Sequence, residues 1–269
     1  MNSDALTSGG VSESSDDLAS PEEVEAFLRT TSFSGYQAVP LPHGLRVPGD
    51  DRVASLDAVF GQGIEGRSVL DVGTYYGRFL YEAKARGATR VVGVELDPGR
   101  WSIADRIAAL HGRPYQVLEG RIEDVELDEG FDLVLVLNVL HHVPDPVAVM
   151  RRAASLCRGV VIVEFPMADH PGYISDMLSR NGAPGLRQRA VAQAYSAALR
   201  LVGRRLPLMA VGGDDYHRTF YFNPGAFRNL FTIHHPYFDE VVFRASPDWP
   251  GRCLAFCRVP ATPSPNGSS

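Results

Sequence analysis

From residue 67 onward, short apolar runs alternate with longer stretches whose apolar positions recur every three or four residues. The short runs predict strands and the longer stretches predict amphipathic helices. Strands are expected at 68–72, 90–95, 115–118, 131–137 and 159–165, and helices at 77–86, 98–111 and 145–157. Alternation of this kind predicts a doubly wound α/β fold, with a mostly parallel sheet and helices on both faces.

After the fifth strand the alternation stops, and residues 167–222 form a connection too long for a plain loop. Such a length is typical of a lid or substrate element. Helical periodicity returns within this insertion at 186–203, and a further helix is expected at 223–230. Two last strands, 238–244 and 252–258, are joined by a turn rich in proline and are expected to form an antiparallel hairpin.

The chain before the first strand is different in character. Residues 1–19 and 261–269 have few large apolar side chains, so both are expected to be disordered tails. Ser20, followed by a proline and two glutamates, is a helix start. Together with a helix predicted at 52–60, it indicates an N-terminal helical cap and substrate segment over 20–60, leaving 61–260 for the main domain.

Composition excludes several kinds of protein. The net charge of −6 over 269 residues gives no general attraction to a phosphate backbone, so nucleic acid is disfavoured as a partner. Cys157, Cys253 and Cys257 form no pair at metal-ligand spacing, which favours a reducing compartment and argues against structural zinc. No apolar run reaches the about 18 residues that span a bilayer, and the N-terminus is acidic. We expect a cytoplasmic protein without a membrane partner.

The first strand carries the most informative motif. It ends at Asp71 and turns through Gly73 and Gly77, and the second strand ends at another acid, Glu95. A glycine-rich turn lets backbone amides approach a ligand, and an acid after the next strand can accept both hydroxyls of a ribose. The pattern therefore predicts a nucleotide site. The turn lacks the middle glycine of a dinucleotide fingerprint, which disfavours a nicotinamide dehydrogenase.

This motif resembles that of class I S-adenosylmethionine-dependent methyltransferases. The resemblance implies a Rossmann-like seven-stranded sheet with an antiparallel last strand, and S-adenosylmethionine as cofactor. It also implies that Gly73, Thr74 and Gly77 let the turn pass under the methionine part, that Glu95 and Leu96 lie at the ribose, and that Asp71 orients the loop.

A second motif, Leu-His-His-x-x-Asp-Pro, follows the strand at 131–137 and resembles small-molecule methyltransferases. Asn138 would then contact the cofactor from the same crevice. Histidine titrates near neutral pH and can take a proton from an acceptor. By the resemblance, His141 would be the base, supported by His142 and by Glu164 on the next strand. Packing and a hydrogen-bonded helix entry are the alternative role for the two histidines.

The residues expected at the adenine match the family pattern less closely. The family has an acid after a glycine in this region, whereas this chain has Arg121. Either Glu123 or Asp124 takes the contact to the exocyclic amine, or Ile122 offers only a backbone contact. Arg121, Ile122 and Glu123 are therefore predicted to lie at the adenine.

The sequence thus predicts a methyltransferase acting on a small molecule in a biosynthetic, natural-product pathway, through oxygen, nitrogen or carbon. Two alternatives stay open: a transfer-RNA wobble-uridine alkyl transferase, which the segment from 36 to 52 loosely resembles, and a non-catalytic cofactor-binding partner. No resident metal is predicted, although Asp214, Asp215 and His217 could hold Mg²⁺. The acceptor and the oligomeric state, including a homodimer, are not fixed by any motif.

Overall fold

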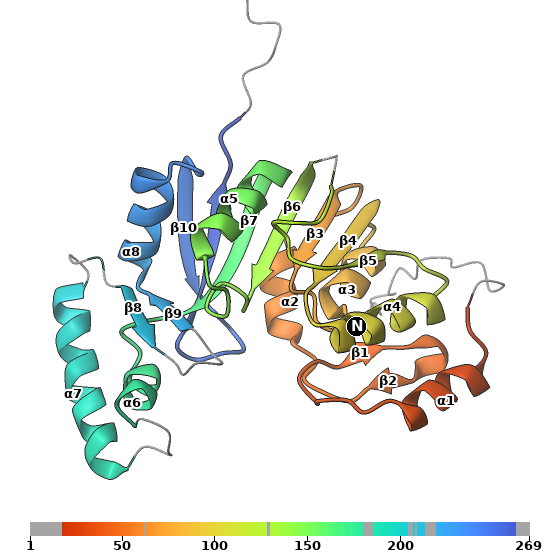
Figure 1. Ribbon diagram of the computed structural model, residues 1–269, viewed down its shortest axis with the longest axis horizontal. Coiled ribbons are helices and arrows are strands. Elements are labelled where there is room, and N and C mark those ends of the chain that lie inside the picture. Colours follow the sequence, from red (N-terminus) through yellow and green to blue (C-terminus); the bar gives the residue numbers. More distant parts are fainter. Residues whose placement is uncertain are drawn as a thin grey trace, which may run out of the picture.

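A seven-stranded sheet forms the centre of the computed structural model, which describes residues 18–61, 63–127, 130–179, 185–203, 207, 209–212 and 219–261 (Figure 1). Its strands are β3 (Ser68–Val72), β4 (Arg90–Glu95), β5 (Gln116–Glu119), β6 (Phe131–Leu137), β7 (Cys157–Pro166), β10 (Glu240–Ala245) and β11 (Arg252–Arg258). They lie in the order β10-β11-β7-β6-β3-β4-β5. Only β11 in this sheet runs antiparallel to its neighbours. The mostly parallel sheet with an antiparallel last strand is confirmed.

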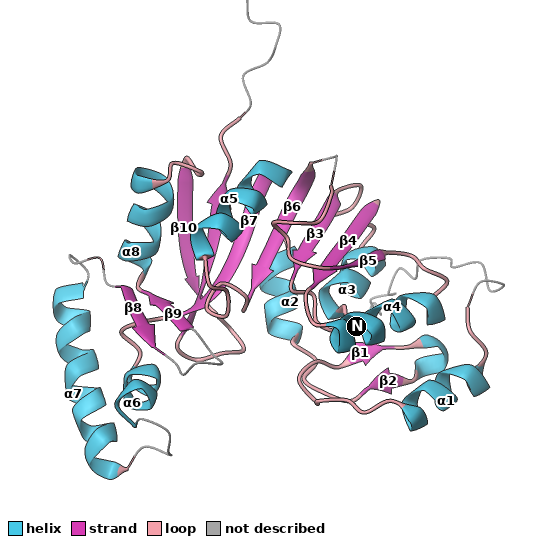
Figure 2. Ribbon diagram, viewed as in Figure 1, coloured by secondary structure: helices cyan, strands magenta, loops and turns pink. Residues whose placement is uncertain are grey.

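Helices cover both faces of this sheet (Figure 2). Because side chains alternate along a strand, Leu70 and Val72 face one way and Val69 the other. The first face packs against α5 (Pro146–Leu156), α8 (Pro224–Arg228) and a π-helical turn at Asn229–His234. The second packs against α2 (Val53–Phe60), α3 (Arg78–Ala85) and α4 (Pro98–Leu110).

The helices after β4 and β6 begin where the sequence predicts. Asp97 accepts a hydrogen bond from the backbone amide of Arg100, and Asp145 accepts two at the start of α5. Each is followed by proline at the first helical position, where no amide donor is needed. These caps fix where the chain leaves the strand ends, and so hold the loops that line the cavity described below.

The N-terminal segment begins with α1 (Pro21–Thr30), which carries a complete capping box between Ser20 and Glu23. A two-stranded ribbon follows, formed by β1 (Val39–Pro40) and β2 (Arg46–Val47) around a 3-10 turn at Pro42–Gly44. This ribbon, which the sequence did not predict, packs with α1 on α4 through a small apolar cluster. The N-terminal segment is therefore anchored to the main body.

The insertion after β7 contains α6 (Pro171–Ser179), α7 (Leu186–Gly203) and a hairpin of β8 (Met209–Gly212) with β9 (Thr219–Phe222). The helix expected at 186–203 is present with those bounds, whereas α6 and the hairpin were not predicted. A parallel bridge between Met167 and Phe222 brings the chain back to the end of β7.

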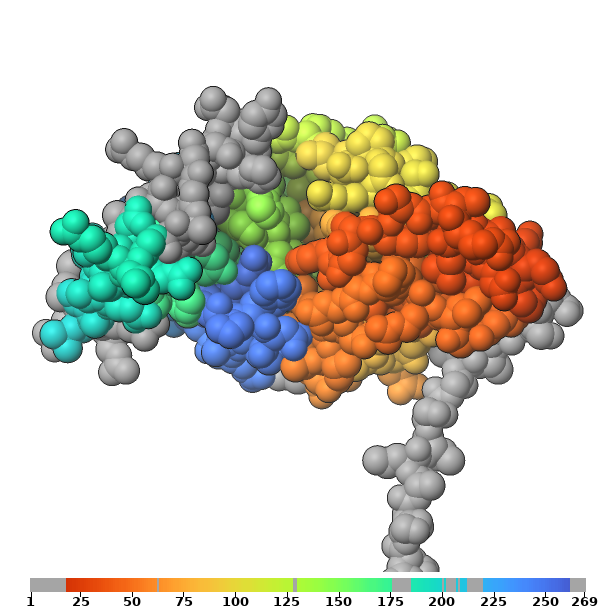
Figure 3. Space-filling model, turned by 90° about the horizontal axis from the view of Figure 1, so that it is seen from below, coloured from red at the N-terminus to blue at the C-terminus, as the bar shows by residue number. Residues whose placement is uncertain are grey.

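The N-terminal segment also meets the C-terminal hairpin. In Figure 3 the residues before β3, red to orange, lie beside the blue end of the chain. The backbone amide of Ser55 donates to Asp248 at 2.8 Å, which joins α2 to the turn between β10 and β11. Within the part of the chain that the structure describes, no helix is long and apolar enough to cross a membrane.

Candidate active site

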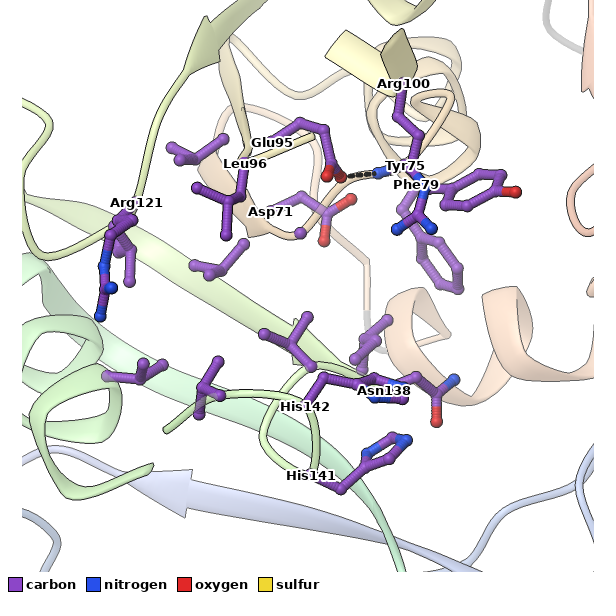
Figure 4. Close-up of a pocket in the computed structure, with 18 of the residues that line it drawn as sticks. Asp71, Tyr75, Phe79, Glu95, Leu96, Arg100, Arg121, Asn138, His141 and His142 are labelled. Atoms are coloured by element: carbon purple, nitrogen blue, oxygen red, sulfur yellow. Dashed lines mark hydrogen bonds between the residues drawn. The ribbon is translucent and has the colours of Figure 1, made fainter. Parts of the chain in front are cut away.

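A cavity of about 590 Å³ opens where β3, β4 and β6 end. Parallel strands place their carboxyl ends at one edge of the sheet, which is where ligands of such folds bind. Figure 4 shows Asp71 and Glu95 on one side of this cavity and Asn138, His141 and His142 on the other. The two sequence motifs, about sixty residues apart, therefore line a single space.

The turn after β3 is tight because of Gly73. Its φ is +70°, and a Cβ atom at this position would lie 2.4 Å from the Cγ2 atom of Val139. Thr74 is buried and donates from its hydroxyl to Asp71, and Gly77 starts α3 with a φ of +84°. Gly73 thus lines the cavity, while Thr74 and Gly77 shape the turn behind it.

Asp71 is an unusual acid. Its side chain is buried, and its one hydrogen-bond donor among the described residues is the Thr74 hydroxyl at 2.8 Å. Burial raises the pKa of Asp71 to about 7, with a smaller contribution from the negative charge of Glu95. The carboxyl therefore changes charge near neutral pH, and a cationic ligand beside it would favour the ionised form.

Glu95 is held by two backbone amides. Its Oε2 atom accepts from the amide of Tyr75 at 2.8 Å, the dashed line in Figure 4, and its Oε1 atom accepts from that of Asp97 at 3.0 Å. Each oxygen retains a further lone pair, so the carboxylate can still accept two hydroxyl groups from the cavity. The next residue, Leu96, lines the cavity with a 62% exposed side chain.

The end of β5 supplies one wall. Arg121, Ile122 and Glu123 all line the cavity, as the sequence predicts for the adenine contact. Ile122 is buried, and Arg121 pairs with Glu123 at 2.9 Å. Arg121 also approaches Asp124 at 3.7 Å. Both charged side chains of this ion pair are partly exposed, at 43% for Arg121 and 20% for Glu123, whereas Ile122 gives this wall a buried apolar side chain.

The two histidines differ in environment. His141 is buried, and its Nδ1 atom has no hydrogen-bond partner among the described residues. Burial, with smaller contributions from the neighbouring His142 and the positive charge of Arg252, lowers the pKa of His141 to about 2. The His142 ring lies 4.0 Å away, centroid to centroid, and is exposed at the cavity mouth. His141 therefore presents a neutral imidazole to the cavity.

Glu164 lies behind Asn138 rather than beside His141. Both Glu164 oxygens are occupied: Oε1 accepts from the hydroxyl of Ser246, and Oε2 accepts from the amide of Asn138 and from Arg52 at 3.2 Å. The side chain is 1% exposed. This carboxylate holds the Asn138 side chain in place. The Oδ1 atom of Asn138 is buried without a partner among the described residues, and Asn138 lines the cavity.

The structure adds lining residues that the motifs did not indicate. They come from the N-terminal segment, from the turn and helix after β3, from α4 and from the start of β11: Tyr36, Gln37, Arg52, Tyr75, Phe79, Arg100 and Arg252. The substrate segment predicted over 20–60 was the sign of the N-terminal group, although it did not indicate which side chains face the cavity. Nothing in the sequence around β11 indicated that Arg252 faces this cavity.

A metal site is not evident in the described ranges, where no three His, Cys, Asp or Glu side chains are grouped to hold an ion. Asp214, Asp215 and His217 lie outside the described residues.

Cys157, Cys253 and Cys257 are free and buried, with Cys253 and Cys257 on β11 as expected.

Comparison with known proteins places this cavity in context. Residues 51–232 match a family described as "Methyltransferase domain". The tRNA U34 carboxymethyltransferase of Dichelobacter nodosus is 39% identical over 120 residues, covering 42% of this chain and 36% of that protein. The ubiquinone biosynthesis O-methyltransferase of Haemophilus ducreyi is 32% identical over 102 residues, covering 36% of this chain and 43% of that protein. The chain therefore spans less than half the length of these curated relatives.

Solved structures share the fold. The N-terminal domain of EvdMO1, determined with SAH and D-fucose, has a TM-score of 0.59 at 14% identity and covers 91% of this chain and 99% of that one. The 1,6-didemethyltoxoflavin-N1-methyltransferase of Burkholderia thailandensis, determined with 1,6-didemethyltoxoflavin and S-adenosylhomocysteine, has a TM-score of 0.52 at 18% identity, covering 90% and 91%.

Proposed function

The chain belongs to the methyltransferase family that its residues 51–232 match, and from this premise we propose that it transfers a methyl group from S-adenosylmethionine to a small-molecule acceptor. The acceptor atom in this proposal is a hydroxyl oxygen, with nitrogen or carbon as alternatives. One observation carries the proposal: a nucleotide-type turn and a buried imidazole nitrogen, which has no partner in the described ranges, face the same cavity.

The cavity residues fit this cofactor. Gly73 lies where any larger side chain would meet Val139, so its backbone can line the cavity without displacing that residue. Glu95 can accept the two ribose hydroxyls. Two buried acceptors without partners among the described residues, Oε1 of Gln37 and Oδ1 of Asn138, offer places for an ammonium group. When bound, the sulfonium supplies an electrophilic methyl carbon for in-line displacement.

His141 is the proposed base. Methyl transfer to a hydroxyl forms a carbon–oxygen bond, breaks a carbon–sulfur bond and releases the hydroxyl proton. The Nδ1 atom of His141 can accept that proton when the ring carries its own proton on Nε2. Its pKa of about 2 makes it a weak base, so it would hold the proton only briefly before passing it on. Glu164 acts in this proposal as a positioning residue, because it holds Asn138 and Arg52 and not the imidazole.

Cofactor binding is tested by calorimetry with S-adenosylhomocysteine. We expect Glu95→Ala to weaken binding by roughly 100-fold, since two hydrogen bonds to a charged acceptor are lost. Glu119, exposed and paired with Glu95 in register on the next strand, gives the matched control Glu119→Ala, which should bind as the wild type does. Glu95→Gln keeps a side-chain oxygen that can accept from the backbone amides of Tyr75 and Asp97, so it controls for misfolding of this loop. Equal affinity in all four proteins would overturn the proposal.

The alternative of a non-catalytic protein is tested at His141. With methyl-labelled cofactor and a metabolite extract, the wild type should transfer label to a small molecule, and His141→Ala should not. If His141→Ala still binds S-adenosylhomocysteine, its loss of activity is due to removal of the base and not to loss of the fold. A wild type that binds the cofactor but transfers no label would favour the non-catalytic role.

A second function, wobble-uridine modification of transfer RNA, is favoured by the similarity to the tRNA U34 carboxymethyltransferase. The net charge of −6 opposes it, because binding to nucleic acid depends mainly on cations that face phosphates. A filter-binding titration with bulk transfer RNA separates the two functions. Tight binding that weakens steeply with salt would favour the tRNA function over the small-molecule one.

A further inference from the structure

Arg252 stands at the end of the cavity farthest from Glu95. It is the first residue of β11 and pairs in register with Pro166, the last residue of β7. The strand order places β7 and β6 between β11 and β3, whereas Glu95 ends β4 on the other side of β3. Strands lie about 4.8 Å apart, so β11 and β4 are separated by roughly 19 Å across the sheet. Arg252 thus belongs to the acceptor half of the cavity.

The guanidinium of Arg252 is fixed but not neutralised. Its Nε atom donates to the hydroxyl of Tyr173 at 3.2 Å, and its Cζ atom lies 5.3 Å from the centroid of the Trp249 ring. These contacts hold the side chain in one orientation. Its Nη1 atom is buried and has no hydrogen-bond partner among the described residues.

Two carboxylates of this region are engaged by another arginine. Glu164 and Asp248 both pair with Arg52, at 3.2 and 3.7 Å. The ion pairs of the described residues do not include Arg252. A guanidinium nitrogen that is buried without a hydrogen-bond partner is costly, and a guanidinium fork matches the two oxygens of a carboxylate or phosphate. The geometry is thus that of an incomplete anion site whose missing part comes from a ligand.

We propose that the acceptor substrate carries an acidic oxyanion, a carboxylate or a phosphate, which binds the Arg252 guanidinium at the β11 end of the cavity. This proposal rests on the methyltransferase function given above and narrows it to acidic acceptors. The anion binds through Nη1, the donor that has no partner among the described residues, while Trp249 and Tyr173 keep the guanidinium aimed into the cavity. Arg252 is thereby a specificity-determining residue, and His141 lines the same cavity within reach of its charge.

The test uses three small probes on the full chain, with and without saturating S-adenosylhomocysteine. Acetate and inorganic phosphate represent the two oxyanions, and acetamide is the uncharged analogue of acetate. Binding is followed by NMR of the arginine Nε–H groups and by calorimetry. We expect saturable binding of one or both anions and none of acetamide, and the preferred anion identifies the acidic group.

Variants assign the effect to one side chain. Arg252→Met should weaken anion binding about tenfold or more, since a charge-assisted hydrogen bond is lost. Arg244→Met is the matched control, because Arg244 is exposed on the neighbouring strand β10 and should leave anion binding unchanged. The wild-type comparison of acetate with acetamide stays decisive if Arg252→Met fails to fold.

Three results would overturn the proposal: no saturable anion binding by the wild type, equal binding by Arg252→Met, or equal binding of acetamide. A fourth is displacement of acetate by S-adenosylhomocysteine, which would assign Arg252 to the cofactor carboxylate. Failure of the wild type to bind S-adenosylhomocysteine would contradict the methyltransferase function and not the anion site. The anion titrations carried out without S-adenosylhomocysteine would still test Arg252.

Discussion

Replacing Arg52 with methionine should be among the most destabilising single changes in this chain. The Arg52 and Glu164 side chains are each 1% exposed, and Arg52 also approaches Asp248 and donates to Ser55. Removing the cation leaves a buried carboxylate without its counter-charge. Breaking a buried ion pair from one side costs about 3–5 kcal/mol. For a domain of this size that corresponds to a fall in melting temperature of roughly 6–20 °C.

Backbone strain at this position does not contribute to the difference in stability between Arg52→Met and the wild type. Arg52 has a φ of +53°, and methionine, which also has a Cβ atom, carries the same strain there. Urea unfolding at neutral pH measures the loss. Arg46→Met is the matched control: its pair with Asp51 has the same 3.2 Å separation but is more than half exposed, so we expect a change of at most about 1 kcal/mol.

A double-mutant cycle completes the test. Adding Glu164→Gln to Arg52→Met removes the uncompensated charge, so the double variant should be less destabilised than the sum of the single variants by about 0.5–3 kcal/mol. Two outcomes would refute the reasoning. The first is a loss below about 1 kcal/mol for Arg52→Met, and the second is strict additivity with Glu164→Gln.

Three further predictions concern single residues. Gly73→Ala should weaken S-adenosylhomocysteine binding at least about tenfold in calorimetry, because its Cβ would meet Val139 at 2.4 Å; unchanged affinity would contradict the tight turn. Asp71 has a folded pKa raised to about 7 from 3.8, so the native state should lose stability as pH rises between these values, by up to about 4 kcal/mol. Asp71→Asn should show a flatter stability profile over that range in urea unfolding, and parallel profiles would refute the shift. Asp145→Ala should cost about 1 kcal/mol in the same assay, since two amides at the start of α5 lose their cap, and no loss would argue against it.

Much of the main sheet could be predicted from sequence because its strands are apolar runs with strong boundaries. The strands 68–72, 90–95 and 131–137 have the predicted bounds. Helices α4 and α5, which begin with proline, differ from their predicted bounds by one residue, α4 only at its C-terminus and α5 at each end. Short elements stabilised by tertiary contacts were not predicted. The ribbon of β1 and β2 has two residues in each strand and no alternation to reveal it.

The residues of the candidate site likewise fall into two groups, those that a local motif indicates and those that only tertiary contacts bring to the cavity. Asp71, Gly73, Glu95 and the histidines lie in local motifs that carry their own spacing, and they do meet at one cavity. Arg52 and Arg252 come from segments 200 residues apart whose patterns assign neither side chain to the cavity, and only the folded chain brings both to the Trp249 ring. Their partners are set by long-range packing, which a local pattern does not encode.

The turn between β10 and β11 has a consequence for how enzymes of this type can diverge. It supplies Ser246, Asp248 and Trp249 to the group around Arg52 and Glu164, yet it is a surface connection outside the nucleotide motif. Mutation and insertion in such a connection are tolerated far more readily than in a buried strand. In descendants of this chain, drift at this hairpin is therefore expected at its exposed positions, Pro247 and Pro250, and not at Ser246 or Asp248, which are tied to Glu164 and Arg52.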